Sequence, residues 1–380
     1  MAGGVGPEIK WNIENESLSY PFMLVVILRG RGMSHEIKLD KEFRASSNTF
    51  VIAEVGHNHQ GSLDKARAIF LAAKESGANA VKLQKRNNRS LFTTELYNAP
   101  YENENSYGAT YGEHREALEF GRNEYLELQN YAKELNLIFF ATPFDFESVD
   151  FLAELQMPAY KIASADLNNT PLQKYIAKQG RPIFLSTGGG TMDDIRRAAD
   201  TILPLNNQLC ILHCTASYPA DVEDMNLNVI PSLLAEYPDQ VIGLSDHENG
   251  IDAASIAYML GARVFEKHFT LNRAWRGTDH SFSLEAEGLR KLVRNLCRIP
   301  VLLGDGNKRL LESEKKPLKK MGKSLVAARD LPAGHRLTDD DIAIKSPSGG
   351  LPPFEFENIL GKSLRVPLVK DEHILHESLD

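Results

Sequence analysis

From residue 49 onward, short β-rich apolar runs alternate along the sequence with longer stretches of amphipathic pattern. The stretches between the runs predict helices, for example at Asp64–Ser76, Asn123–Leu135, Met192–Leu203 and Ile251–Leu260. Regular alternation of strand and helix is typical of βαβ units and a parallel sheet. Eight units with no sign of a reversed strand order favour a closed (β/α)₈ TIM barrel over an open sheet. The apolar runs predict strands at Thr49–Gly56, Ala80–Gln84, Ile138–Pro143, Ala159–Ser164, Pro182–Thr187, Leu209–Thr215, Val241–His247 and Arg263–Thr270.

The pattern changes after the eighth unit. A charged run, Glu312-Ser-Glu-Lys-Lys-Pro-Leu-Lys-Lys, predicts a linker or a surface helix, and short β-like pieces broken by turn residues follow it. Those pieces predict a small β-rich domain that leans on the barrel or on another subunit, because so few residues make a small core. We therefore expect an N-terminal extension and barrel lead-in at 1–48, a barrel at 49–303, a linker at 304–321 and a small domain at 322–380. Within the extension, 1–32 is a candidate for disorder and Met33 a candidate translation start.

Composition and charge exclude several classes of protein. The chain has 380 residues with 42% hydrophobic and 25% charged residues, which is ordinary for a globular enzyme. A net charge of −8 argues against a nucleic-acid partner, which requires a basic face. The apolar stretch Tyr20–Leu28 has about half the length of a membrane span and resembles no signal peptide. Three cysteines are too few for a disulfide framework and indicate a reducing compartment, so we expect a cytoplasmic protein.

Polar or ionisable side chains end almost every predicted strand. The carboxyl ends of barrel strands form the catalytic face, and an unpaired buried charge is costly. These side chains therefore indicate a functional site, and the long connection from Lys85 to about Gly121 is a candidate lid or binding loop. The strand-end residues are Glu54, Lys82, Gln84, Thr142, Lys161, Ser164, Ser186, Thr215, Ser245, His247 and His268.

His247 and His268 end neighbouring strands, which places two imidazoles side by side at the predicted mouth. Neutral imidazoles suit a divalent ion, and two protein ligands leave positions open for water and a substrate oxygen. Each histidine alone could also be a hydrogen-bonded rim residue. The pair indicates a metal site.

Lys82 and Lys161 provide two cations at the same face, surrounded by hydroxyl groups. This combination predicts a receptor for a small, multiply charged anion. A Schiff-base aldolase with Lys161 or Lys82 as nucleophile is the competing interpretation. Glu54 and Asp279 are the carboxylates that we assign to chemistry, with a rim salt bridge as the alternative for each.

Several segments resemble the sialic acid synthase family. They include Ile52-Ala-Glu-Val-Gly-His-Asn-His-Gln-Gly, Tyr160-Lys-Ile-Ala-Ser, Ile242-Gly-Leu-Ser-Asp-His and Glu266-Lys-His-Phe-Thr. The resemblance runs from about residue 36 to 378. It includes a C-terminal antifreeze-like (SAF, β-clip) domain, to which Pro332-Ala-Gly and Leu360-Gly-Lys are similar.

The resemblance implies a metal-dependent condensation of phosphoenolpyruvate with open-chain N-acetylmannosamine, in which phosphate leaves by C–O cleavage. It implies manganese at His247 and His268, with magnesium or cobalt as alternatives, and a domain-swapped homodimer without nucleic-acid or membrane partners. The catalytic positions fall on Glu54, Asp279 and Lys161. The substrate-binding positions fall on Lys82, Gln84, Thr142, Lys161, Ser164, Asp166, Ser186, Tyr218 and Ser245.

Departures from the family pattern leave the acceptor sugar open. Ala216 stands where bacterial members often carry asparagine, and Ser346 stands at the position of an arginine that contacts the N-acyl group. Tyr111-Gly-Glu-His is closer to the animal branch, which uses N-acetylmannosamine 6-phosphate, and Arg86 and Arg89 could meet that phosphate. The sequence favours free N-acetylmannosamine, with the 6-phosphate or a precursor of legionaminic or pseudaminic acid as alternatives. The Schiff-base aldolase and a non-catalytic carbohydrate-binding protein are the alternatives from other classes.

Overall fold

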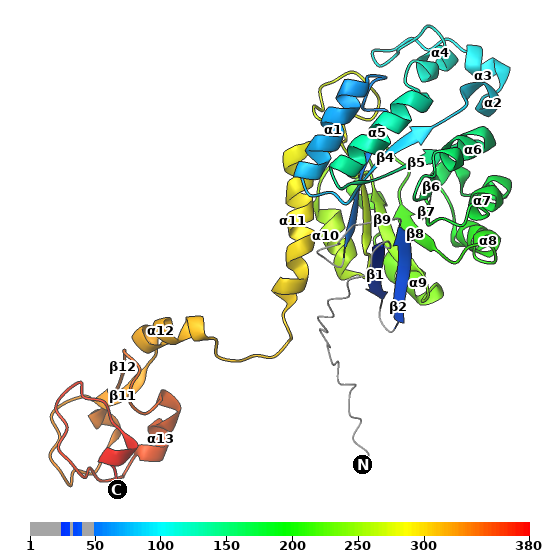
Figure 1. The fold of residues 1–380 in the computed structure, drawn as a ribbon. Helices are drawn as coiled ribbons and strands as arrows, with labels where there is room; N and C mark the ends of the chain where they lie inside the picture. The colour runs from blue at the N-terminus through cyan, green and yellow to red at the C-terminus, as the bar shows by residue number, and fades with distance from the viewer. Residues whose placement is uncertain (1–23, 31–32, 40–48) are drawn as a thin grey trace. The chain divides into compact units, whose positions relative to one another are not determined.

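The computed structural model of the chain describes residues 24–30, 33–39 and 49–380. Residues 1–23, 31–32 and 40–48 lie outside the described residues. The expected disorder of 1–32 and the translation start at Met33 therefore stay predictions. The chain divides into two compact units, Met1–Leu303 and Gly304–Asp380, which are described separately (Figure 1). Before the barrel, β1 (Leu24–Gly30) and β2 (Met33–Leu39) pair as an antiparallel hairpin that the sequence pattern did not predict.

The first unit contains the predicted closed barrel. Its parallel strands follow the order β10-β3-β4-β5-β6-β7-β8-β9, so each strand pairs with its neighbours in the chain and the last strand closes on the first. The (β/α)₈ prediction is therefore confirmed. The barrel strands are β3 (Phe50–Gly56), β4 (Ala80–Lys85), β5 (Ile138–Pro143), β6 (Tyr160–Ile162), β7 (Ile183–Ser186), β8 (Leu209–Cys214), β9 (Val241–Asp246) and β10 (Val264–His268).

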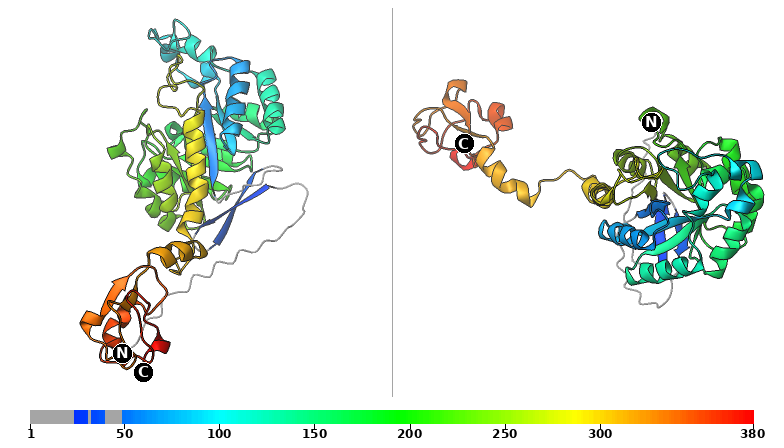
Figure 2. Two further views of the ribbon diagram at one scale, coloured as in Figure 1. Left: turned by 90° about the vertical axis from the view of Figure 1, so that its left-hand side faces the viewer. Right: turned by 90° about the horizontal axis from the view of Figure 1, so that it is seen from above.

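Helices surround the strands, as the views in Figures 1 and 2 agree. The predicted helices differ from the observed ones only by a residue or so at their ends. Sequence signals explain where they begin and end: the Ser62 hydroxyl accepts from Lys65 N at the start of α1, and Gly77 follows its end at φ +90°. The helices of this unit are α1 (Leu63–Glu75), α2 (Asn88–Leu91), α3 (Thr94–Asn98), α4 (Tyr111–Glu116), α5 (Arg122–Glu134), α6 (Phe146–Glu154), α7 (Thr170–Ala177), α8 (Met192–Ile202), α9 (Val229–Glu236), α10 (Asp252–Met259) and α11 (Ala286–Leu303).

Alternating strand residues fill the barrel interior. One apolar cluster includes Phe50, Phe140, Phe184 and Leu212, and the Phe140 and Phe184 rings stack with their centroids 5.2 Å apart. Residues two positions further along several of these strands are polar, for example Lys82 after Ala80. The apolar layer therefore forms the base on which a polar layer rests at the carboxyl ends of the strands.

The long connection after β4 is folded into short helices rather than an irregular loop. It carries α2, α3 and α4, and a bridge between Pro100 and Thr110 ties its middle together. The Thr110 side chain and Glu113 form a reciprocal cap at the start of α4. This connection places Arg115 at the carboxyl face of the barrel.

The second unit has its own apolar core, which includes Leu325, Leu337, Ile359 and Ile374. Its charged run forms the surface helix α12 (Glu312–Met321), and β11 (Ser324–Ala327) pairs antiparallel with β12 (Ile342–Lys345). The helix α13 (Phe356–Ile359) and several 3₁₀ turns complete it. Within the described part of the chain, no helix combines the length and apolar character needed to cross a membrane.

Candidate active site

A cavity of about 590 Å³ opens at the carboxyl ends of the barrel strands. It brings together all the residues that the sequence predicted for catalysis, substrate binding and metal binding, except Asp166. Residues from β3, β4, β5, β6, β7, β9 and β10 contribute to it, as expected for the catalytic face of a TIM barrel. The predicted residues that line it are Glu54, Lys82, Gln84, Thr142, Lys161, Ser164, Ser186, Tyr218, Ser245, His247, His268 and Asp279.

Two buried lysine–glutamate pairs form the floor of this cavity. Lys82 Nζ lies 2.6 Å from Glu54 Oε2 and donates to Thr142 Oγ1 over 2.9 Å. Lys161 Nζ donates to Ser186 Oγ over 2.6 Å and lies 3.5 Å from Glu266 Oε1. Each ammonium group is therefore held in a fixed place by a carboxylate and a hydroxyl.

Burial and neighbouring charges shift the ionisation of this floor. Burial lowers the pKa of Lys161, assisted by the nearby Lys82 and opposed by Glu266. Burial alone would raise the pKa of Glu266, but Lys161 and Lys82 outweigh it and lower that pKa to about 2. Glu266 is therefore a carboxylate at neutral pH, and its Oε2 atom is buried with no hydrogen-bond partner among the described residues.

The two predicted metal ligands lie side by side. The ring centroids of His247 and His268 are 5.4 Å apart, and the Tyr218 ring lies 4.2 Å from that of His247. His247 Nδ1 lies 2.8 Å from the carbonyl oxygen of Thr215, which can only accept, so Nδ1 carries the proton. Burial, with a smaller contribution from the nearby His268, lowers the pKa of His247 to about 3. The ring is therefore neutral and its Nε2 lone pair is free to bind an ion.

The residues present fit a divalent ion held by this pair. His268 Nδ1 is buried and without a hydrogen-bond partner in the described part of the chain, and Asp279 Oδ2 lies 3.7 Å from it. Such nitrogen and oxygen donors suit a transition-metal ion. Across residues 24–30, 33–39 and 49–380, no group of three or more His, Cys, Asp or Glu side chains has metal-binding geometry. Any ion here would keep positions for water and substrate.

Asp279 and Glu54 approach each other across Gly56. An ideal Cβ at Gly56 would lie 3.2 Å from both Asp279 Oδ2 and Glu54 Oε1, and Gly56 has φ +51°. The strand pairing between β3 and β4 shifts between Glu54 and Gly56, an irregularity often found beside active sites. The absence of a side chain at Gly56 therefore lets the two carboxylates lie close to each other.

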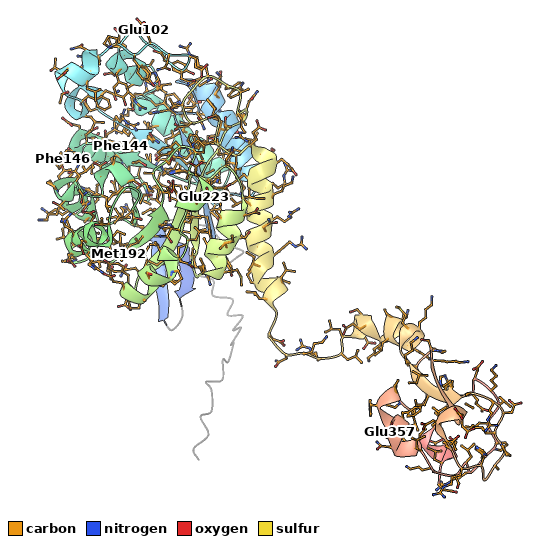
Figure 3. The ribbon with its side chains drawn as sticks, turned by 180° about the vertical axis from the view of Figure 1, so that it is seen from behind. Glu102, Phe144, Phe146, Met192, Glu223 and Glu357 are labelled. Atoms are coloured by element: carbon orange, nitrogen blue, oxygen red, sulfur yellow. The ribbon has the colours of Figure 1, made fainter. Side chains whose placement is uncertain are left out.

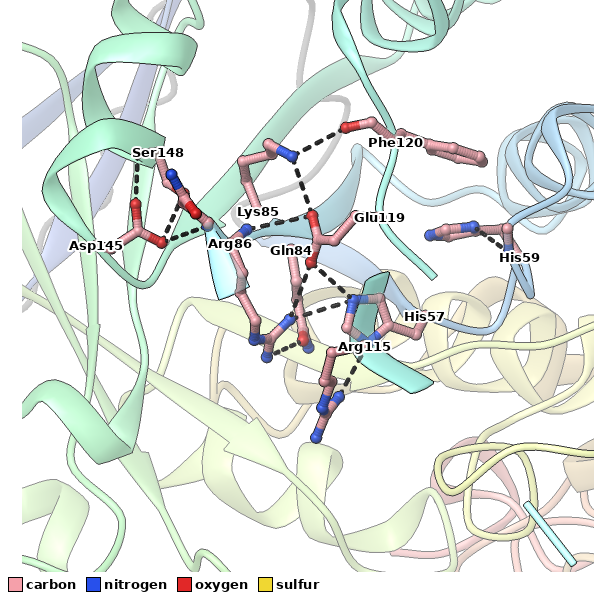
Figure 4. A network of polar contacts seen from close by, with 12 residues as sticks. His57, His59, Gln84, Lys85, Arg86, Arg115, Glu119, Phe120, Asp145 and Ser148 are labelled. Atoms are coloured by element: carbon pink, nitrogen blue, oxygen red, sulfur yellow. Dashed lines mark hydrogen bonds and ion pairs between the residues drawn. The ribbon is translucent and has the colours of Figure 1, made fainter. Parts of the chain in front are cut away.

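Arg86 and Arg115 line another part of the cavity, and both guanidinium groups contact His57 (Figure 4). These three residues are called the cationic group. His57 Nε2 is 3.1 Å from Arg86 Nη1, and its Nδ1 is 3.3 Å from Arg115 Nη1. Burial, followed by Arg86 and Arg115, lowers the pKa of His57 well below its ordinary value. A neutral imidazole has one acceptor nitrogen, so it can accept from only one of the two guanidinium groups.

The charges of this cationic group are only partly balanced. Arg86 Nη1 is 3.9 Å from Glu119 Oε1, a carboxylate that also pairs with Lys85. Arg86 lies over the ring of Phe144, which Figure 3 labels, at 3.8 Å. Within the described part of the chain, the other hydrogen-bond partner of the Arg115 guanidinium is the uncharged Tyr111 hydroxyl. The Asp279 carboxylate is near enough for its charge to interact with that of Arg115. The group therefore presents excess positive charge to the cavity.

Three residues that the sequence indicated do not line the cavity: Thr215, Asp166 and Arg89. The Thr215 hydroxyl donates to the carbonyl oxygen of Asp224 over 3.0 Å. Asp166 lies in the 3₁₀ turn Ser164–Asp166 after β6, and its Oδ1 accepts from Asn169. Arg89 is exposed and lies over the Tyr97 ring, so the predicted pairing of Arg86 with Arg89 is replaced by Arg86 with Arg115. Sequence reasoning missed Arg115 and Glu266. A two-residue step back from His268 would have found Glu266, whereas no local signal distinguishes Arg115.

Comparisons with known proteins found similar families, relatives and solved structures. A model of the NeuB family matches residues 69–308, and a model of the SAF domain matches residues 322–379. Human N-acetylneuraminate-9-phosphate synthase is 42% identical over 332 residues, covering 87% of this chain and 92% of that protein. N,N'-diacetyllegionaminic acid synthase of Legionella pneumophila is 34% identical over 355 residues, covering 92% and 99%.

A solved structure is also similar to this chain. The N-acetylneuraminic acid synthetase of Leptospira borgpetersenii, in complex with citrate, has a TM-score of 0.63 and 31% identity. The match covers 79% of this chain and 96% of that one.

Proposed function

The chain belongs to the NeuB family of sialic acid synthases, and we propose that it condenses phosphoenolpyruvate with open-chain N-acetylmannosamine 6-phosphate. C3 of phosphoenolpyruvate forms a bond to the aldehyde carbon, water adds at C2, and the C2–O bond breaks to release phosphate. The observation that carries the proposal is the convergence of two lysines, two histidines and three carboxylates in one cavity of about 590 Å³.

The lysine floor is suited to phosphoenolpyruvate. Lys82 uses two of its three N–H donors on Glu54 and Thr142, which leaves a third for a substrate oxygen. Ser164 lines the same cavity and adds a hydroxyl group. Ser245 donates its hydroxyl to Glu266 Oε1 over 3.2 Å and so helps to hold that carboxylate. Because the two lysines are held by Glu54 and Glu266, the receptor is organised before the substrate arrives, which lowers the cost of ordering it.

His247 and His268 would hold the divalent ion, for which we propose manganese. When bound there, the ion supplies Lewis acidity that polarises the aldehyde carbonyl of the acceptor. The hydrogen bond from His247 Nδ1 to Thr215 fixes that ring so that Nε2 is the available ligand atom. Glu54 and Asp279, on either side of Gly56, can orient the attacking water and the acceptor hydroxyls and hold protons as they are transferred.

We expect His247→Ala and His268→Ala each to lose most of the activity while the chain stays folded, because each would remove one of two protein ligands. EDTA should have the same effect on the parent protein. Phosphate release in the presence of excess EDTA measures this, and persistent turnover would contradict the metal role.

The cationic group Arg86–His57–Arg115 supports the phosphorylated acceptor over the free sugar that the sequence favoured. Two guanidinium groups that compete for one imidazole lone pair have N–H donors to spare, and a phosphoryl dianion would accept from both. The similarity to a protein named as a 9-phosphate synthase points the same way.

The acceptor is tested by phosphate release from phosphoenolpyruvate with N-acetylmannosamine 6-phosphate, free N-acetylmannosamine and a diacetamido-hexose side by side. We expect the highest kcat/KM with the 6-phosphate. Equal or faster turnover of either unphosphorylated sugar would contradict that choice and leave the condensation itself in place.

The cationic group is tested by Arg115→Met and Arg86→Met. Each should raise KM for the 6-phosphate by about tenfold or more, since a hydrogen bond to a charged group contributes about 1.5–3 kcal/mol. KM for phosphoenolpyruvate should stay within about twofold, because its receptor is formed by other residues. Arg89→Met is the matched control, since Arg89 comes from the same connection and does not line the cavity.

A further inference from the structure

A buried ion pair lies behind the two histidines, outside the cavity. Asp246 and Lys267 are cross-strand partners on β9 and β10, with exposed fractions of 3% and 1%. Lys267 Nζ donates to Asp246 Oδ2 over 2.8 Å. Neighbouring strand residues, such as Leu244 and Phe265, belong to the apolar core between strands and helices. Charges at these positions therefore call for an explanation.

The contacts of Lys267 surround the turn that carries His247. Lys267 Nζ also donates to the carbonyl oxygen of Glu248, and Asp246 Oδ1 accepts from Glu248 N over 2.9 Å. The residues before and after His247 are thus tied to each other and to one ammonium group. The carbonyl of His247 itself accepts from Ala220 N over 3.0 Å.

Lys267 also directly precedes His268 in β10. Successive strand residues point to opposite faces, so His268 faces the cavity while Lys267 faces away from it. One side chain therefore connects the strand that presents His268 with the turn that presents His247.

Stability alone gives a weak reason for this pair. A buried ion pair often contributes no more than well-packed apolar residues of the same volume, because desolvation offsets the attraction. The ion pair does provide directional hydrogen bonds, which restrict the turn Asp246–Glu248 to one conformation.

We infer that Lys267 is a positioning residue, which holds the turn Asp246–Glu248 so that His247 and His268 can share one divalent ion. The inference rests on the proposed metal role of the two histidines. The ring separation of 5.4 Å and the 2.8 Å contact from His247 Nδ1 to Thr215 are the geometry that Lys267 maintains.

Two variants separate positioning from stability. Lys267→Met removes the ammonium group and leaves Asp246 as an unpaired buried charge, which is destabilising. The double variant Asp246→Asn/Lys267→Met removes both charges, so its urea midpoint should return toward that of the parent. Both variants should nevertheless bind Mn²⁺ about 10- to 100-fold more weakly, the range for loss of a group that supports a metal ligand.

The first measurement is titration with Mn²⁺ alone, followed by electron paramagnetic resonance of the free ion. The matched control is Asn206→Ala, which removes buried hydrogen bonds to Arg181 and Gln208 just before β8, at the opposite end of the barrel. This control should lower the urea midpoint without changing the Mn²⁺ affinity.

The second measurement needs no metal. In protein labelled with ¹⁵N-histidine, the Nδ1–H proton of His247 that faces Thr215 should give a resolved signal in the parent, which broadens or disappears in the double variant. Unchanged Mn²⁺ affinity in a folded double variant, or an unchanged Nδ1–H signal, would overturn the inference. If the parent itself binds no Mn²⁺, the proposed metal role fails, and the Nδ1–H signal alone decides whether Lys267 positions His247.

Discussion

At the scale of single residues, Gly56 lies at a crowded position between two carboxylates of the candidate site. Its ideal Cβ position is 3.2 Å from a carboxylate oxygen of Asp279 and 3.2 Å from one of Glu54, which is tighter than nine in ten real Cβ contacts. Its φ of +51° also belongs to the left-handed region, where side chains cost about 1–2 kcal/mol. A methyl group here would both strain the backbone and separate the two carboxylates.

We predict that Gly56→Ala lowers kcat/KM by about 100-fold, because small displacements of positioned groups can cost that much. The control is Gly180→Ala, which has a similar φ of +67° but nothing within 4 Å of its ideal Cβ. Both variants should lose about 1 kcal/mol of unfolding free energy. Steady-state kinetics and urea unfolding of both variants test this, and equal activity in the two would mean that the space at Gly56 is not needed.

The sequence indicated most of the cavity residues because the barrel fixes where strand ends point. Once Lys82, Lys161 and His268 are read as strand-end residues, the fold brings them to one face. Asp166 escaped this rule because it lies beyond the strand end, in a 3₁₀ turn that bonds its carboxylate to Asn169. The sequence shows which residues lie at the end of a strand, but it does not show which way a side chain in the following turn points.

At the scale of elements, two connections meet across the mouth of the barrel. Tyr107, in the connection after β4, donates its hydroxyl to the carbonyl of Arg276 over 2.8 Å. Gly277 N donates to Asn105 Oδ1 over 2.8 Å, and the Arg276 guanidinium lies 4.7 Å from the Tyr107 ring centroid. The same two connections carry Arg115 on one side and Thr278 with Asp279 on the other. These contacts therefore join the two connections at the part of the cavity where we propose that the acceptor binds.

We predict that the double variant Asn105→Ala/Tyr107→Phe raises KM for the acceptor by about tenfold, since each hydrogen bond is worth about 1 kcal/mol. The affinity for phosphoenolpyruvate should not change, because its lysine receptor lies on the barrel floor. Steady-state kinetics and hydrogen exchange of residues 272–281 measure the effect. Tyr97→Phe, which removes a hydroxyl that bonds Glu116 inside the first connection, should have no such effect.

The helices and strands were easier to predict from the sequence than the contacts between the two connections. Alternation of strand and helix gave the barrel, and the length of the connection after β4 suggested a lid or a binding loop. Tyr107 and Arg276 are 169 residues apart, however, and no local pattern relates them. The contribution of Arg115 to the cavity was missed for the same reason: tertiary contacts, rather than periodicity, set its place.

At the scale of the whole molecule, the chain is two units with separate apolar cores. The domain-swapped homodimer stays a prediction, as does the cytoplasmic compartment. Ser346, at the family's arginine position, accepts from Lys323 and donates to the carbonyl of Met321, so its hydroxyl is engaged within the second unit. Serine also lacks the guanidinium group of that arginine, so we expect a different residue to contact the acyl group if the acceptor carries one.

Asp341 is fully buried in the second unit and accepts hydrogen bonds from several of its residues. Arg329 donates to Oδ1 over 2.7 Å, and His335 Nε2 lies 2.8 Å from Oδ2. The backbone and hydroxyl of Thr338 also donate to Oδ2. Burial alone would raise the pKa of Asp341, but these hydrogen bonds outweigh it and hold the pKa below its ordinary value. The folded unit therefore prefers the ionised carboxylate more strongly than the unfolded chain does.

The stability that Asp341 provides must then depend on pH in one direction. A carboxylate with a lowered folded-state pKa contributes fully above its unfolded pKa of about 3.9 and loses that contribution as the pH falls below it. We predict that Asp341→Asn lowers the unfolding free energy of the second unit by about 2 kcal/mol at pH 7. The difference from the parent should shrink when the pH is lowered below about 3.9, where the parent's carboxyl begins to take up its proton on unfolding.

Urea titrations followed by amide NMR signals of residues 322–379 measure this difference in unfolding free energy, with barrel signals as the internal control. A difference that is the same at neutral and acidic pH would mean that the neutral amide loses packing rather than charge. A shift in the barrel midpoint would mean that the two units do not unfold independently.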